Sequence, residues 1–256
     1  MFDVAGVGPA DLLPFILVGF VAQMIDGALG MAFGVISNTL LISLGVPPAS
    51  ASAIVHTIKN FTGAVSAISH IAHRNVDWRL FWRLVIPGVA GGVLGAYVLT
   101  EILPSVAKPL VLAYLAAIGI FLIWRGFTQI HREKPPRIVE PLGFAGGFLD
   151  AAGGGGWGPV VTSNLLVQGG TPRIAVGTVN TAEVFLALAI TATFLFSIGI
   201  SALGPPALGL LIGGLAAAPF GGYVAARVSA KWMLAMVGIV LTVTSLYGLY
   251  GAIIRA

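Results

Sequence analysis

Long apolar runs fill most of this chain, and they constrain its fold more than any other feature. The runs cover residues 12–44, 50–70, 80–100, 105–125, 141–168, 174–198, 205–226 and 232–254. A run of about 20 apolar residues is long enough to cross a lipid bilayer as a helix. Only 9% of the residues are charged, against about 25% in a soluble domain, so the chain has too little polar surface for water. The sequence therefore predicts an all-α polytopic membrane protein.

The two halves of the chain are related in sequence. A shift of 124 positions aligns residues 19–61 with residues 143–185 without a gap. The shift brings into register Gly19 and Gly143, Asp26 and Asp150, Gly30 and Gly154, Phe33 and Trp157, Gly34 and Gly158, Gly45 and Gly169, Pro48 and Pro172, Thr57 and Thr181, and Phe61 and Phe185. A shared lipid environment explains matched Leu and Val, but it does not explain matched Asp, Pro and Gly. We therefore expect an internal duplication, which is typical of many transporters.

The positions of Lys and Arg indicate how the two halves face. If each half crosses the membrane four times, both halves face the same way, and the charges divide eight inside to four outside. If the first run of each half is a hairpin that returns to its own side, the halves are inverted and the division becomes ten to two. Because cytoplasmic loops are enriched in Lys and Arg, the inverted arrangement is favoured.

We therefore expect two inverted repeats, each a broken or re-entrant helical hairpin plus three transmembrane helices, with both termini outside. Residues 1–128 form the first repeat and residues 141–256 the second. Residues 129–140 are the predicted basic cytoplasmic linker, because this is the hydrophilic stretch between the apolar runs of the two halves. The first apolar run is expected to stay in the mature protein, because no basic residue precedes it as in a signal peptide.

Several classes of function find no support in the residues. The chain has no cysteine, which excludes a disulfide framework, a thiolate metal site and thiol-based electron transfer. It has no P-loop, no GxSxG nucleophile elbow and no HExxH zinc site. We therefore expect no enzyme, no ATP motor, no cofactor and no metal. The net charge of +4 lies in the loops and indicates membrane topology rather than nucleic-acid binding.

A glycine-rich segment that begins with an aspartate lies within the first run of each half. Each glycine weakens a helix by about 1 kcal/mol relative to alanine, so the four glycines at 153–156 favour unwound backbone. Such backbone is tolerated at membrane depth where it lines a cavity, and free N–H groups at a helix start there would bind an anion. The structural alternative is tight helix packing. The candidate substrate ligands are Gly27, Gly30, Gly34, Gly153, Gly154 and Gly155.

Asp26 and Asp150 occupy equivalent positions in these two segments. One explanation is structural, because an aspartate caps a broken helix by accepting backbone N–H bonds. The functional explanation is proton coupling or gating, because a buried carboxyl group retains its proton more readily near neutral pH.

The helix after each glycine-rich segment carries a second polar group. Its candidate substrate ligands are His56, Thr57, Lys59 and Asn60 in the first half, and Asn180 and Thr181 in the second. Lys59 supplies positive charge for an anionic substrate, and its repeat equivalent is Glu183, a third candidate for proton coupling. The structural alternative is an ion pair of Lys59 with Glu183 between the halves. His56 is either a proton carrier near neutral pH or a hydrogen-bonded structural histidine.

A third polar group follows each glycine-rich segment, as Ser37, Asn38 and Thr39 in the first half and Thr162, Ser163 and Asn164 in the second. The structural explanation is hydrogen bonding between helices. The functional explanation is neutral donors to substrate oxygens, for which Asn38, Ser163 and Asn164 are the candidates.

These motifs resemble the sulfite exporter TauE/SafE family. The segments that carry the resemblance are GFVAQMIDGALGMAFG (19–34), GVPPASASAIVHTIKNFTGA (45–64), GFLDAAGGGGWGP (147–159) and GGTPRIAVGTVNTAEVF (169–185). The resemblance covers nearly the whole chain, and it implies an inner-membrane carrier for small sulfur-containing anions such as sulfite or organosulfonates. It carries no fixed catalytic signature to transfer onto single residues.

We therefore expect a multi-pass secondary transporter of the inner membrane that moves a small sulfur-containing anion and is coupled to protons. Its expected partners are the anionic substrate and the lipid bilayer, with no nucleic acid, and a homo-oligomer is compatible with the sequence. The alternative is a carrier for Na⁺ or a metal ion, because two symmetric aspartates and unwound carbonyl groups also suit a cation.

Overall fold

The structure, a computed structural model, describes residues 9–29, 33–127, 136–162, 164–165, 168–217 and 230–254. All the regular elements in these residues are helices. The first half contains α1 (Pro9–Leu29), α2 (Phe33–Ser43), α3 (Pro48–Ala72), α4 (Trp78–Glu101) and α5 (Pro104–Phe127). The second half contains α6 (Glu140–Gly153), the π-helical segment η2 (Trp157–Thr162), α8 (Pro172–Ile198), the short 3₁₀ segment η3 (Ile200–Ala202), α9 (Gly204–Ala217) and α11 (Ala230–Ile254).

The helices follow the apolar runs closely, so the prediction of an all-α membrane protein is confirmed. Helices α3, α4, α5, α8 and α11 begin and end within two residues of the predicted runs. Among the described residues, α4, α5 and the Ile174–Ile198 part of α8 are long and apolar enough to cross a membrane. Prolines and a capping aspartate mark several helix starts. Pro48, Pro104 and Pro172 stand at the first helical position, where the missing N–H costs nothing, and Asp77 caps α4 through the N–H of Arg79 at 2.9 Å.

The first run of the second half is broken into two pieces, as predicted. In the second half, α6 ends at Gly153 and η2 begins at Trp157, so the glycines between them are not helical. In the first half, α1 ends at Leu29 and α2 begins at Phe33, and the residues between them lie outside the described residues.

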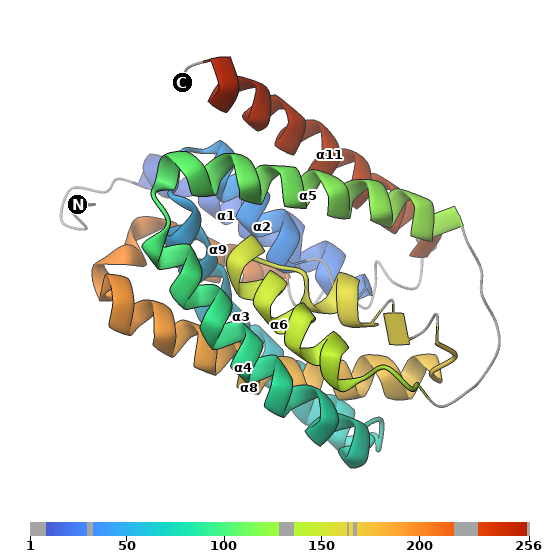
Figure 1. Cartoon of the computed structure of the whole chain (residues 1–256). Coiled ribbons are helices and arrows are strands. Elements are labelled where there is room, and N and C mark those ends of the chain that lie inside the picture. The colour runs from blue at the N-terminus through green and yellow to red at the C-terminus, as the bar shows by residue number, and fades with distance from the viewer. Residues whose placement is uncertain are drawn as a thin grey trace.

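Helices from the two halves pack against each other in pairs (Figure 1). Helix α3 lies against α8, and α5 lies against α11. Helix α4 packs on α6, whereas α9 packs on α1. The 124-residue shift carries α3 onto α8, α5 onto α11 and α4 onto α9, so the second two contacts are equivalent. This pattern is expected when two related halves pack against each other through equivalent surfaces.

Contacts along α3 and α8 show that these two helices run in opposite directions. The Asn60 amide donates to Thr191 Oγ1 at 3.0 Å. Further along α3, His70 Nε2 lies 3.5 Å from the amide of Asn180, which is earlier in α8. Helices α5 and α11 are also antiparallel, because Leu112 contacts Gly248 at one end and Phe127 stacks edge-on with Trp232 at the other.

Small residues allow the backbones of α4 and α6 to approach closely. A Cβ added to Gly91 would lie 2.0 Å from the carbonyl oxygen of Phe144, and one added to Gly147 would lie 2.1 Å from that of Gly88. Glycine is therefore required on both sides of this interface, as in many membrane helix pairs.

Candidate functional site

Each aspartate of the glycine-rich segments caps the helical segment that follows the break. Asp26 Oδ1 accepts the backbone N–H of Phe33 at 2.8 Å, and Asp150 Oδ1 accepts that of Trp157 at 2.9 Å. The donor is seven residues after the aspartate in both halves, so the predicted capping role is confirmed. The expectation of free N–H groups for an anion is wrong at Phe33 and Trp157, because a carboxylate of the chain already occupies both.

The unwound glycines of the second half meet the start of α2 in the interior of the protein. Gly154 and Gly155 have φ angles of +71° and +144°, which glycine adopts without strain. A Cβ on Gly155 would lie 2.5 Å from the carbonyl carbon of Gly34, and one on Gly34 would lie 3.5 Å from Lys59 Nζ. The glycines of the two halves therefore touch each other beside the ammonium group of Lys59.

Side chains from two neighbouring helices hold the glycine segment of the second half. The buried amide of Asn38, on α2, donates to the Gly153 carbonyl oxygen at 2.8 Å. The Tyr114 hydroxyl, on α5, donates to the Gly155 carbonyl oxygen at 3.3 Å. The unwound backbone thus gains hydrogen-bond partners from both sides, which satisfies carbonyl groups that a helix would otherwise bond.

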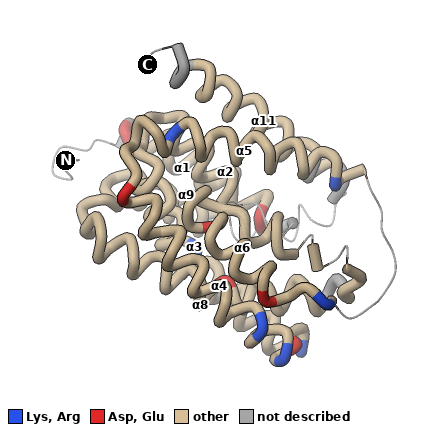
Figure 2. Tube along the Cα trace, viewed as in Figure 1, with Lys and Arg blue, Asp and Glu red and all other residues tan. Residues whose placement is uncertain are grey.

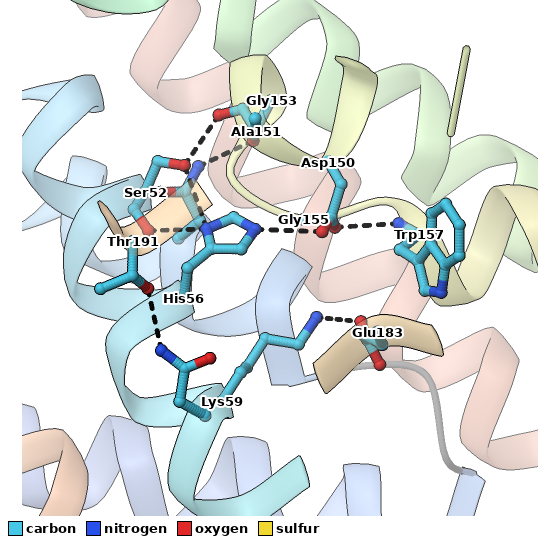
Figure 3. Close-up of polar contacts among 12 residues, drawn as sticks. Ser52, His56, Lys59, Asp150, Ala151, Gly153, Gly155, Trp157, Glu183 and Thr191 are labelled. Carbon is cyan, nitrogen blue, oxygen red and sulfur yellow. Dashed lines mark hydrogen bonds and ion pairs between the residues drawn. The ribbon is translucent and has the colours of Figure 1, made fainter. Parts of the chain in front are cut away.

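Lys59 and Glu183 form an ion pair between α3 and α8 (Figure 3). Their side chains are only 12% and 17% exposed. The predicted ion pair between the halves is therefore confirmed. Lys59 also interacts electrostatically with Asp150 and Asp26, so three carboxylates surround one ammonium group.

His56 and Asp150 form a second pair, which joins α3 to α6. His56 Nε2 lies 3.0 Å from Asp150 Oδ2, and neither side chain is exposed. On the other side of the ring, His56 Nδ1 lies 2.8 Å from the Ser52 carbonyl oxygen. The Ser52 hydroxyl donates to the Ala151 carbonyl oxygen at 2.7 Å. Figure 3 shows this chain of contacts running from α3 to the glycine segment.

Other predicted ligands have contacts away from these two pairs. Thr57 and Thr181 donate to the carbonyl groups one turn earlier in their own helices. Asn60 bonds Thr191, and Asn180 lies beside His70. Asn164 is exposed, and its amide donates to the Val160 carbonyl oxygen at 2.8 Å. The structure thus joins His56, Lys59, Asp150 and Glu183 to the glycine segments, but it gives Thr57, Thr181 and Asn164 local bonds.

Two predicted substrate ligands and part of the predicted linker fall outside the part of the chain that the structure describes. Gly30 and Ser163 lie outside the described residues, as do residues 129–135 of the predicted linker. Gly27 lies within α1, before its end at Leu29.

Sequence reasoning missed Ser52 and Tyr114. Ser52 precedes His56 by one helical turn, so its position on the same face of α3 was a signal. Tyr114 lies in an otherwise apolar run, and nothing in that run indicates that its hydroxyl reaches the Gly155 carbonyl.

A salt bridge at the start of α6 joins Arg83 of α4 to Glu140, which directly precedes the apolar run 141–168. Arg83 Nε and Nη2 donate to the two carboxylate oxygens of Glu140 at 2.5 and 3.0 Å. These hydrogen bonds lower the pKa of the Glu140 carboxyl from 4.5 to about 2. Figure 2 shows Lys and Arg gathered near this end of the molecule, around the starts of α4 and α6.

Comparison with known proteins identifies the family. The family model described as Sulfite exporter TauE/SafE matches residues 15–248. The chain belongs to the TauE/SafE family. The resemblance seen in the glycine-rich segments is therefore confirmed, and the chain is a membrane transporter of this family.

Two relatives carry transporter names. The probable membrane transporter protein YtnM of Bacillus subtilis (strain 168) is 40% identical over 236 residues, which cover 89% of this chain and 79% of that protein. A probable membrane transporter protein of Haemophilus influenzae is 30% identical over 149 residues, which cover 54% of this chain and 58% of that protein. Both names agree with a TauE/SafE transporter whose buried polar residues lie among apolar helices.

Proposed function

We propose that this protein is a secondary transporter that moves sulfite or a small organosulfonate across the inner membrane together with protons. The observation that carries the proposal is the Lys59–Glu183 ion pair, which lies beside the contact between Gly34 and the Gly154–Gly155 backbone. A charged side chain inside a membrane protein is costly and marks a substrate or ion pathway by default.

The pair gives the protein a way to couple protons to an anion. While Glu183 is ionised, its carboxylate competes with a substrate for the Lys59 ammonium group. A proton on Glu183 removes that competition, so Lys59 becomes available to the anion. The anion and the proton therefore bind together, and the ammonium group never remains unpaired in the interior.

Unpaired hydroxyl groups support a site for substrate oxygens. Ser37 Oγ and Thr162 Oγ1 are fully buried and have no hydrogen-bond partner among the described residues. An unsatisfied buried polar group costs about 1–3 kcal/mol. Both residues follow the glycine segments by a few positions, where we predicted neutral donors, and we propose that they serve the bound anion.

We also propose that the halves are inverted repeats and that the chain crosses the inner membrane several times, with both termini outside. The antiparallel course of α3 against α8 and of α5 against α11 supports this arrangement. These are equivalent helices, and repeats that faced the same way would make them parallel.

A cation carrier remains the second candidate, because the site has an excess of acid. Asp26, Asp150 and Glu183 all interact electrostatically with Lys59, so the carboxylates exceed the ammonium group by two. This excess suits Na⁺ or another monovalent ion better than a transition metal, since no group of three His, Cys, Asp or Glu side chains within the described ranges is placed to hold a metal ion.

Flux measurements in liposomes test the proposal. Purified protein should accumulate labelled sulfite and methanesulfonate when a pH gradient is imposed. Methanesulfonate keeps its charge near neutral pH, so its pH dependence reports on the protein. A joint Lys59→Ala and Asp26→Asn variant should lose this flux, with His73→Gln as the control outside the site. Unchanged flux in the joint variant would reject the site, and Na⁺ flux without sulfonate flux would favour the second candidate.

A further inference from the structure

His56 and Asp150 are placed so that their contact requires a proton. His56 Nδ1 lies 2.8 Å from the Ser52 carbonyl oxygen, which only accepts hydrogen bonds, so Nδ1 carries a hydrogen. The Ser52 hydroxyl lies 3.4 Å from the same nitrogen, but its hydrogen is donated to the Ala151 carbonyl oxygen.

The other ring nitrogen then faces an acceptor. In a neutral imidazole with hydrogen on Nδ1, Nε2 presents a lone pair. Asp150 Oδ2 is 3.0 Å away and also presents lone pairs when ionised. Two lone pairs at this distance repel each other in a fully buried site, so a proton lies on Nε2 or on Oδ2.

We propose that the buried His56–Asp150 pair binds a second coupling proton, in addition to the one on Glu183, and that this proton enters and leaves with the anion. The coupling of this proton to transport rests on the proposed function, whereas the proton site itself rests on the contacts described above. It assigns His56 to a proton rather than to the substrate, and it places this proton apart from the Lys59–Glu183 pair that receives the anion.

Charged and titratable groups from the packed elements surround the pair. They are Lys59 on α3, Glu183 on α8, Asp26 on α1 and Tyr114 on α5, and each interacts electrostatically with Asp150 or with Lys59. The pair therefore lies in a network of one ammonium group, two further carboxylates and a phenol hydroxyl.

The pair is also tied to the glycine segment that touches Gly34. Asp150 Oδ1 accepts the N–H of Trp157, and the Ser52 hydroxyl bonds Ala151. Loss of the proton removes the bond of Asp150 to His56, and the same Asp150 side chain caps Trp157 after the glycines. A change of protonation therefore acts on the backbone that lies beside the Lys59 ammonium group.

The site exists in one half. The 124-residue shift carries His56 onto Asn180 and Ser52 onto Val176. An amide and an alkyl group do not titrate, so the second half has no equivalent pair. We therefore expect this site to bind one proton per chain.

The charge of the site fixes the sign of the coupling. With the proton bound, the His56–Asp150 pair is neutral; without the proton, it carries one negative charge. That charge repels an anion at Lys59, so proton binding strengthens anion binding. By thermodynamic reciprocity, anion binding strengthens proton binding by the same factor, which makes the two ions symported.

Spectroscopy of the purified full chain tests the proton site without any transport assay. In ¹⁵N-histidine NMR and infrared spectra near neutral pH, we expect either a His56 imidazolium or a protonated Asp150 carboxyl. Raising the pH should remove that signal in one step. Asp150→Asn should abolish it, and His73→Gln, at an exposed histidine, should leave it in place. A neutral His56 ring without a protonated carboxyl in the wild type would overturn the inference.

The amide that Asp150→Asn introduces preserves both contacts, since its oxygen accepts from Trp157 and its nitrogen donates to a neutral His56. Misfolding is therefore not expected to obscure the result. In wild-type liposomes, the methanesulfonate concentration at half-maximal flux should rise on the order of 5- to 150-fold as the proton is lost, the usual range for coupled sites.

Asp150→Asn should flatten this pH profile whatever its absolute rate, and a variant with the wild-type profile would reject the coupling role. If the wild type transports neither sulfite nor methanesulfonate, the proposed function fails, and the spectra still decide the proton site.

Discussion

Lys59 and Glu183 stand 124 residues apart, which is the offset that relates the two halves, and their side chains form an ion pair. Two equivalent positions touch each other only where an element lies against its own copy. Helices α3 and α8, which the 124-residue offset relates, therefore pack against each other at this position. At this position the halves have diverged to opposite charges, which lets one pair replace two costly unpaired charges.

Removing one member of the Lys59–Glu183 pair should destabilise the protein more than removing both members. Lys59→Ala or Glu183→Ala alone leaves one charge without its partner, and we expect a loss of about 3–5 kcal/mol in the free energy of unfolding. The double variant should recover most of that loss. Chemical unfolding in detergent measures the coupling as a double-mutant cycle. Additive effects of the two substitutions would contradict the pair.

A side chain at Gly155 should disrupt the contact between the two glycine segments. Gly155→Ala adds a Cβ 2.5 Å from the backbone of Gly34 at a φ of +144°. Gly45→Ala is the matched control, because its φ is +92° and nothing lies within 4 Å of the added Cβ. The control should cost only the backbone strain, about 1–3 kcal/mol.

We expect Gly155→Ala to cost more in thermal unfolding and to abolish sulfonate flux, whereas Gly45→Ala should retain flux. Equal effects of the two substitutions would show that close packing at Gly155 is unimportant.

Two substitutions at Asp26 separate its capping role from its charge. Asp26→Asn keeps an oxygen for the Phe33 N–H, whereas Asp26→Ala removes the bond. Only the alanine variant should lose the stability of a helix cap, about 0.5–2 kcal/mol. If the charge also serves transport, both variants should lose proton-coupled flux. Full flux in the asparagine variant would leave Asp26 with its structural role alone.

The Arg83–Glu140 salt bridge should stabilise the protein in a defined pH range. The pKa of Glu140 falls from 4.5 to about 2 in the folded protein, so its ionised form is favoured by folding. The stabilisation is complete above about pH 4.5 and disappears as the pH falls through about 2. Because both side chains are exposed, the effect should be small.

Melting temperatures of the wild type and of Glu140→Gln should therefore differ near neutral pH and converge in acid. A difference that grows on acidification would contradict this assignment. Flux near neutral pH should be the same in both proteins.

The absence of native cysteines makes the topology directly testable. Thr171→Cys and Ser201→Cys, at two exposed positions, distinguish the arrangements. In inverted repeats, position 171 is cytoplasmic and position 201 is outside; if each half crosses four times, the sides are exchanged. Labelling of intact cells with an impermeant maleimide should modify Ser201→Cys and spare Thr171→Cys. Ser105→Cys is the control that both arrangements place outside, and the opposite pattern would reject inversion.

Much of the fold follows from local properties of the sequence. Apolar runs located α3, α4, α5, α8 and α11 because helix length and hydropathy are local. The break after Gly153 was predictable because consecutive glycines disfavour a helix wherever they lie. The Lys59–Glu183 contact was one of the two explanations that the sequence left open, because the 124-residue offset places an acid at the position equivalent to the base.

The sequence by itself thus determined the membrane class, and it indicated two related halves in which Lys59 and Glu183 hold equivalent positions. Only the tertiary structure decided that His56 faces Asp150, because these residues are 94 positions apart and no symmetry relates them. It also decided that the aspartates, not a substrate, occupy the Phe33 and Trp157 N–H groups. Both outcomes depend on how the helices pack around the glycine segments, and non-local packing leaves no periodic signal in the chain.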